Sequence, residues 1–62
     1  MTKYEDIKKG DILCLKLRDV EKYVLVLKKE DGLKIYWMKT KEIVWYNIGL
    51  TTHFLSLSRK ML

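Results

Sequence analysis

The stretch KYVLVLKKEDGLKIYW, Lys22 to Trp37, decides the fold. Two apolar runs flank Asp31-Gly32, and glycine accepts the positive φ that a tight hairpin turn requires. Val, Ile, Leu, Tyr and Trp dominate both runs, and these side chains suit a pleated surface. The stretch therefore predicts two antiparallel strands, Lys22–Lys29 and Leu33–Lys39.

A period of two in the apolar residues extends outward from this hairpin in both directions. It predicts strands at Asp11–Leu17, Glu42–Tyr46 and His53–Ser58, with a loop or single helical turn at Asn47–Thr52. Five short strands in 62 residues are too few for a sandwich of two full sheets. They predict an all-β fold, a small five-stranded barrel, in which residues 1–62 form a single domain.

Alternation along the last three strands assigns large side chains to opposite faces. The predicted core side holds Ile35, Trp37, Ile43, Trp45, Leu55 and Leu57. The opposite side keeps Tyr36, Met38, Val44, Tyr46 and Phe54, next to several lysines. Apolar groups that cluster outside a core commonly mark a contact surface.

This second side predicts a noncatalytic module that binds another protein or its own copies. Its candidate partner-binding residues are Tyr36, Met38, Tyr46 and Phe54, with Lys34, Lys39 and Lys41 as a polar rim. The rings would supply the apolar contact. The lysines would attract acidic partners.

The charge leaves an alternative open. Thirteen Lys and Arg against eight Asp and Glu give a net charge of +5, and only Arg18 and Arg59 are arginines. Lysine suits phosphate backbones but lacks the planar fork with which arginine reads base edges. Lysines interleaved with aromatic rings are what a nonspecific binder of single-stranded DNA or RNA needs. The alternative is such a binder, using the same surface.

Residues for catalysis or metal binding are scarce. Cys14 has no second cysteine and His53 no second histidine, and no phosphate-cradling glycine motif is present. We expect no enzymatic activity, metal, cofactor or small-molecule substrate, and we expect Cys14 to be a buried apolar residue.

The N-terminal sequence MTKYEDIKKGD is charged from its third residue, and no apolar run is long enough to cross a bilayer. A single cysteine agrees with a reducing compartment. We therefore expect a soluble, cytoplasmic protein with no membrane partner.

The order KKGDIL at Lys8–Leu13, then KYVLVL, LKIYW and IVW, resembles small SH3-like proteins encoded by bacteriophages. The resemblance spans residues 8–58, and its distinctive residues are Gly10-Asp11, Trp37 and Trp45. It implies a five-stranded SH3-like barrel and an accessory or virion-associated role, in the host cytoplasm or the virion. The aromatic motif and the Pro-Ser-Asn-Tyr type segment of peptide-binding SH3 domains are lacking, so polyproline recognition is not expected.

Overall fold

Five antiparallel strands, one 3-10 helix and one α-helix make up the structure, a computed structural model that describes residues 2–61. In chain order the elements are η1 (Tyr4–Asp6), β1 (Ile12–Leu17), β2 (Val20–Lys29), β3 (Gly32–Trp37), β4 (Glu42–Asn47), α1 (Ile48–Ser56) and β5 (Ser58–Met61). The strands form one sheet in the order β4-β3-β2-β1-β5. The predicted all-β class is confirmed, with one short helix added to it.

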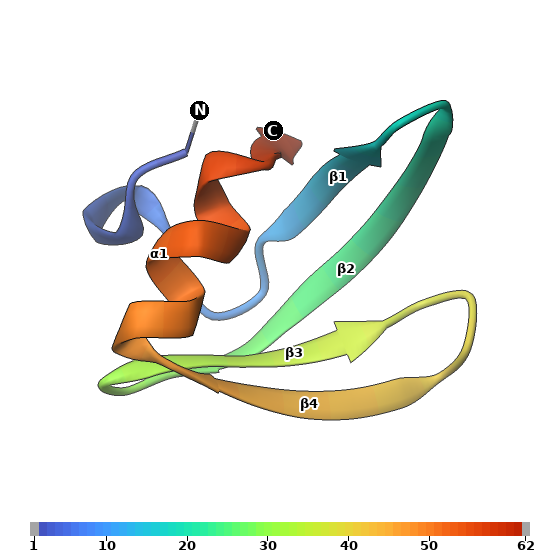
Figure 1. Ribbon diagram of the computed structural model, residues 1–62. Coiled ribbons are helices and arrows are strands. Elements are labelled where there is room, and N and C mark those ends of the chain that lie inside the picture. Colours follow the sequence, from blue (N-terminus) through green and yellow to red (C-terminus); the bar gives the residue numbers. More distant parts are fainter. Residues whose placement is uncertain (1, 62) are drawn as a thin grey trace.

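The sheet is bent but open. Within residues 2–61, β4 and β5 lie at its two edges and do not pair with each other. Figure 1 shows α1 near one end of the β1–β2 and β3–β4 hairpins, which diverge towards their tips at the other end. The closed barrel expected from the sequence is therefore not confirmed.

The hairpin between β2 and β3 is confirmed, and Gly32 makes it possible. Its φ is +143°, and a Cβ at this position would collide with the carbonyl oxygen of Tyr46 on β4. The Tyr4 hydroxyl donates to the Gly32 carbonyl at 3.1 Å and accepts from its N–H at 3.2 Å. The turn therefore lies in close contact with the end of β4, where only glycine fits, and it holds the N-terminal segment through Tyr4.

The core fills the space between the inner face of the sheet and the two helices. Its buried residues are Ile7, Leu13, Leu15, Val24, Val26, Leu33, Ile35, Phe54 and Leu55. Tyr4, Trp37 and Tyr46 pack against this cluster and are partly buried. Cys14 is buried as predicted, although it lies on the other face of β1.

The face of β4 that packs against the core is the opposite of the one predicted. The connection from β3 to β4 has an even number of residues, so Ile35 pairs directly with Val44. Directly paired residues of antiparallel strands point to the same face, which places Val44 and Tyr46 on the core side. Ile43 and Trp45 are exposed, so the prediction that they are buried is wrong.

The strand predicted at His53–Ser58 is also wrong, because most of this segment belongs to α1. Asn47 starts the helix: its side-chain oxygen accepts a hydrogen bond from the N–H of Leu50 at 2.9 Å, as an N-cap does. The fifth strand forms only afterwards and pairs with β1. No helix among residues 2–61 is long and apolar enough to cross a membrane.

One side of α1 packs onto the sheet. Its buried residues are Thr51, Phe54 and Leu55; the last two lie three and four positions after the first, as on one face of a helix. The Phe54 ring lies 5.2 Å from the Tyr46 ring and 6.0 Å from the Trp37 ring, and only 7% of the residue is exposed. Phe54 was expected outside and Leu57 inside; Leu57 is in fact exposed.

Candidate contact surface

A row of apolar side chains crosses the outer face of the sheet from edge to edge. Met61 pairs with Ile12, Ile12 with Leu25, Leu25 with Tyr36, and Tyr36 with Ile43. Each strand therefore contributes one residue, and direct pairing places all five on one face. This face lies opposite the buried core, where an antiparallel sheet commonly carries polar side chains.

The outer apolar face comprises this row together with Tyr23 on β2 and Trp45 on β4. Its exposed members are Ile12, Tyr23, Ile43, Trp45 and Met61, each between 37% and 56% exposed. At roughly 200 Å² for a large side chain, they leave on the order of 400 Å² open to water. The largest apolar patches of monomeric proteins have this size and are often functional.

Positive charge borders the outer apolar face. Lys34 pairs in register with Trp45 on one side and Lys28 on the other. Its side chain is exposed and takes part in none of the ion pairs found among residues 2–61. Arg59 lies on the same face and approaches Glu21 at 4.0 Å. The face is therefore apolar in its centre and net positive around it.

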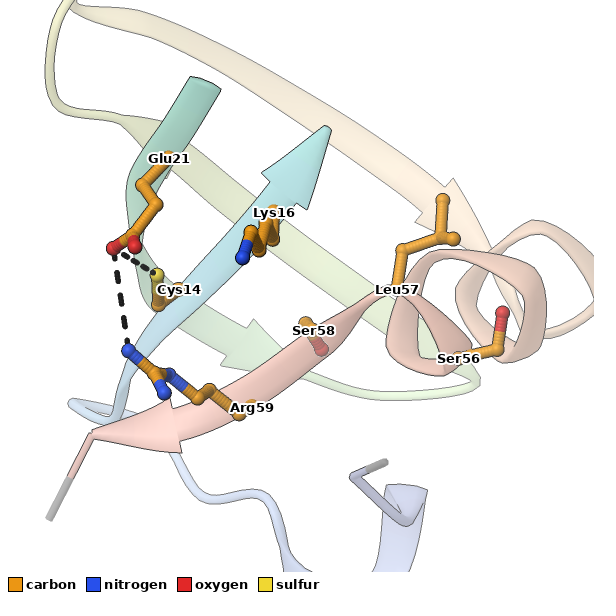
Figure 2. A pocket seen from close by; sticks show the side chains of 7 residues that line it. All are labelled: Cys14, Lys16, Glu21, Ser56, Leu57, Ser58 and Arg59. Atoms are coloured by element: carbon orange, nitrogen blue, oxygen red, sulfur yellow. Dashed lines mark hydrogen bonds and ion pairs between the residues drawn. The ribbon is translucent and has the colours of Figure 1, made fainter. Parts of the chain in front are cut away.

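A hollow of about 250 Å³ lies at the β5 side of this face, beside the end of α1 (Figure 2). It is lined by Cys14, Lys16, Glu21, Ser56, Leu57, Ser58 and Arg59. The Cys14 thiol donates to the Glu21 carboxylate at 3.5 Å, and the same carboxylate approaches Arg59 (Figure 2). These contacts link β1, β2 and β5, and they form a polar border to the apolar row.

The same carboxylate affects Tyr23. The Tyr23 hydroxyl donates to Glu21 at 3.3 Å. The negative charge of Glu21, and to a smaller degree Cys14, raises the pKa of this hydroxyl above its ordinary value. Loss of the Tyr23 proton therefore moves to higher pH, which extends the range in which this hydroxyl can donate to Glu21.

Four of the predicted partner-binding residues separate onto two faces. Tyr36, half-buried, and Lys34, exposed, lie on the outer face. Tyr46 and Phe54 lie on the core side and pack against each other. The expected exposure of Phe54 is wrong because α1 turns its ring inward.

The other three, Met38, Lys39 and Lys41, belong to the turn between β3 and β4. Both lysines are exposed, and Lys41 adopts a positive φ of 63° that completes the turn. They lie at the tip of the hairpin, beyond the ends of both strands. The predicted single surface is thus divided between the outer face and this tip.

The exposure of Ile43 and Trp45 was not predicted, because Trp45 was assigned to the core as a large ring and Ile43 lies on the same face of its strand. The signal that locates them is the length of the connection between the two strands. An even number of connecting residues pairs odd positions of one strand with even positions of the next. Applied to Glu42–Asn47, this rule turns Ile43 and Trp45 outward.

Comparison of the chain with models of protein families, with curated proteins and with solved structures found no match.

Proposed function

We propose that the chain is a noncatalytic interaction module that binds another protein through its outer apolar face. The observation that supports this is the unbroken row from Met61 through Ile12, Leu25 and Tyr36 to Ile43. A stable interface buries about 800 Å² on each partner, with an apolar centre and a polar rim. The outer apolar face supplies about half of that area, and the surrounding lysines supply the rim.

The charge around this face favours a partner of opposite sign over a second copy. Lys34 and Arg59 lie beside the apolar row, and Lys39 and Lys41 add charge at the hairpin tip. Two copies placed face to face would bring two net positive borders together, and like charges in a partly desolvated contact are costly. The partner we propose therefore carries an apolar patch with an acidic rim.

We also propose the relationship to phage-encoded SH3-like barrels, with an accessory or virion-associated role in the host cytoplasm or the virion. Its support is the sequence order together with five antiparallel strands in which the last returns to pair with the first. Gly10, one of the distinctive residues, has a φ of +94° where the chain turns into β1. These features agree with the resemblance at the level of strand order.

The test compares two equally exposed apolar residues on different sides of the molecule. Ile43 on the outer face is 56% exposed, and Leu50 on α1 is 57% exposed. A photo-crosslinking amino acid at each position, in the native cells, should give a specific protein adduct from position 43 and none from position 50. Lys34→Glu should weaken the adduct at position 43.

Adducts of equal yield from both positions would contradict the proposed function. So would adducts from position 43 that contain only a second copy of the chain, since these would show that the face pairs with itself. The proposed function would also be contradicted if neither position captured a partner protein while circular dichroism showed that the chain itself remained folded.

A further inference from the structure

A second surface lies at the open end of the sheet, where the tips of the two hairpins diverge (Figure 1). A hollow of about 230 Å³ there is lined by Lys22, Tyr23, Trp37, Lys39, Thr40, Glu42 and Val44. Beside it, a hollow of about 330 Å³ is lined by Val20, Glu21, Lys22, Tyr23, Met38 and Lys39. The two share Lys22, Tyr23 and Lys39, and we call the first hollow, which Trp37 lines, the Trp37 groove.

Trp37 is the rigid part of this groove. Its ring meets the buried Phe54 edge to face, with centroids 6.0 Å apart and planes at 85°. Trp37 itself is only partly buried, and the Lys22 ammonium lies 6.0 Å from its ring centroid. The core therefore fixes the orientation of the indole, while part of its surface faces the groove under a flexible cation.

The lysines of the groove are available for an anion. Lys22 and Lys39 are exposed, and neither takes part in an ion pair among residues 2–61. Both are lysines, which bind phosphate as point charges without reading base edges. A planar ring beside two free ammonium groups is the combination that binds a stacked base and its phosphates.

Glu42 decides between two anionic ligands. It pairs directly with Trp37 across the β3–β4 ladder, so it lies on the same side as the ring and lines the same hollow. Its carboxylate would repel an acidic side chain or a phosphate next to the ring, so the phosphates of a bound strand have to lie at the lysines and only a neutral group can lie at Glu42. The carboxylate would instead accept a hydrogen bond from the exocyclic amino group of a base stacked on Trp37.

We propose that the Trp37 groove binds single-stranded nucleic acid, with a base on Trp37, phosphates at Lys22 and Lys39, and the amino group of the base at Glu42. Cytosine and adenine carry such an amino group and thymine does not, so oligo(dC) and oligo(dA) should bind more tightly than oligo(dT). Tyr23 lines this groove and also belongs to the outer apolar face, but none of the four side chains proposed to hold the nucleic acid is a member of that face. The nucleic-acid site does not depend on the protein contact proposed above.

The probe is fluorescein-labelled oligo(dC) of about eight nucleotides, with binding followed by anisotropy. Lys22→Gln and Lys39→Gln should each weaken binding and lower the slope of log Kd against log salt by about 0.7. Lys34→Gln is the matched control: it removes a lysine from the outer side of β3 and should leave Kd unchanged. Glu42→Gln should reduce the preference for oligo(dC) over oligo(dT).

Stacking is read from Trp37 itself. The chain has two tryptophans, so Trp45→Phe leaves Trp37 as the sole emitter, and oligo(dC) should quench it. Trp37→Leu should weaken binding about 10-fold. Should Trp37→Leu fail to fold, the Lys22→Gln and Lys39→Gln variants still decide the matter.

The proposal would be overturned by affinity independent of salt, by an equal loss of binding in Lys34→Gln, or by an acidic peptide that binds and quenches as well as oligo(dC). Equal affinity for a duplex would also overturn it. Ile43→Thr, which removes apolar surface from the outer apolar face without a change of charge, should leave oligonucleotide binding unchanged, so each proposal can fail without the other.

Discussion

Replacing Ile35 and Ile43 by threonine in separate variants tests which face of β3 and β4 packs into the core. Both changes keep a β-branched side chain, so strand propensity cancels between them. Ile35 is 0% exposed and Ile43 is 56% exposed. In Ile35→Thr, a lost methyl group costs about 0.8 kcal/mol and a buried hydroxyl without a partner about 1–3 kcal/mol, before any cavity is counted.

The expected loss for Ile35→Thr is therefore about 3 kcal/mol. A domain of 62 residues has a free energy of unfolding of about 3–9 kcal/mol, so this variant should lose between about a third and all of its stability. Ile43→Thr removes little buried area, and water can reach its hydroxyl, so the loss should stay below about 1 kcal/mol.

Urea unfolding of both variants, followed by circular dichroism and tryptophan emission, measures the difference through the midpoint and the m-value. The two variants should differ by about 2 kcal/mol, with unchanged m for Ile43→Thr. If Ile43→Thr is the more damaging change, or if the two losses are equal, β4 does not have the register described above. The outer apolar face would then lose its edge residue.

Three further changes test other parts of the fold. Gly32→Ala should cost more than about 1 kcal/mol in urea unfolding, because φ is +143° and the new Cβ meets the Tyr46 carbonyl; a neutral result would contradict this turn geometry. Asn47→Ala should cost about 1 kcal/mol by the same measurement through loss of the α1 cap, whereas no change would argue against the cap. The backbone N–H of Lys8 donates to the Asp11 carboxylate at 2.8 Å and is the main cause of the lowered pKa of Asp11. The ionised Asp11 carboxylate therefore stabilises the fold above pH 3.8, its ordinary pKa, and this stabilisation is lost as the pH falls through the folded-state pKa. Asp11→Asn should accordingly flatten the acid-unfolding curve, and a curve identical to that of the parent chain would refute this role.

The parts of the fold that local chemistry determines could be predicted from the sequence. Asp31-Gly32 located the central hairpin because few other residues tolerate the turn. The strand Ile12–Leu17 and the burial of Cys14 followed from the apolar run in which Cys14 lies. Half-buried Tyr36 and exposed Lys34 were placed on the outer face correctly, because they belong to this same hairpin.

The parts that depend on pairing across the sheet could not be read from alternation alone. Val44 and Ile43 are both apolar and β-branched, so composition does not say which one faces inward, and the register decides. Phe54 and Leu55 have the same ambiguity, since two adjacent large residues suit a helix face as well as a strand. The cap at Asn47 resolves it in favour of the helix.

The two proposed surfaces follow from how few elements among residues 2–61 cover the five-stranded sheet. One nine-residue helix and a 3-10 turn cover the inner face, and they cover it only at one end. The outer apolar face has no covering element among residues 2–61, and the Trp37 groove lies where the inner face extends past the helix. Among residues 2–61, an apolar row and an indole groove with two lysines therefore remain uncovered on opposite faces of the same strands. Ligands of different chemistry could therefore bind the two faces at the same time.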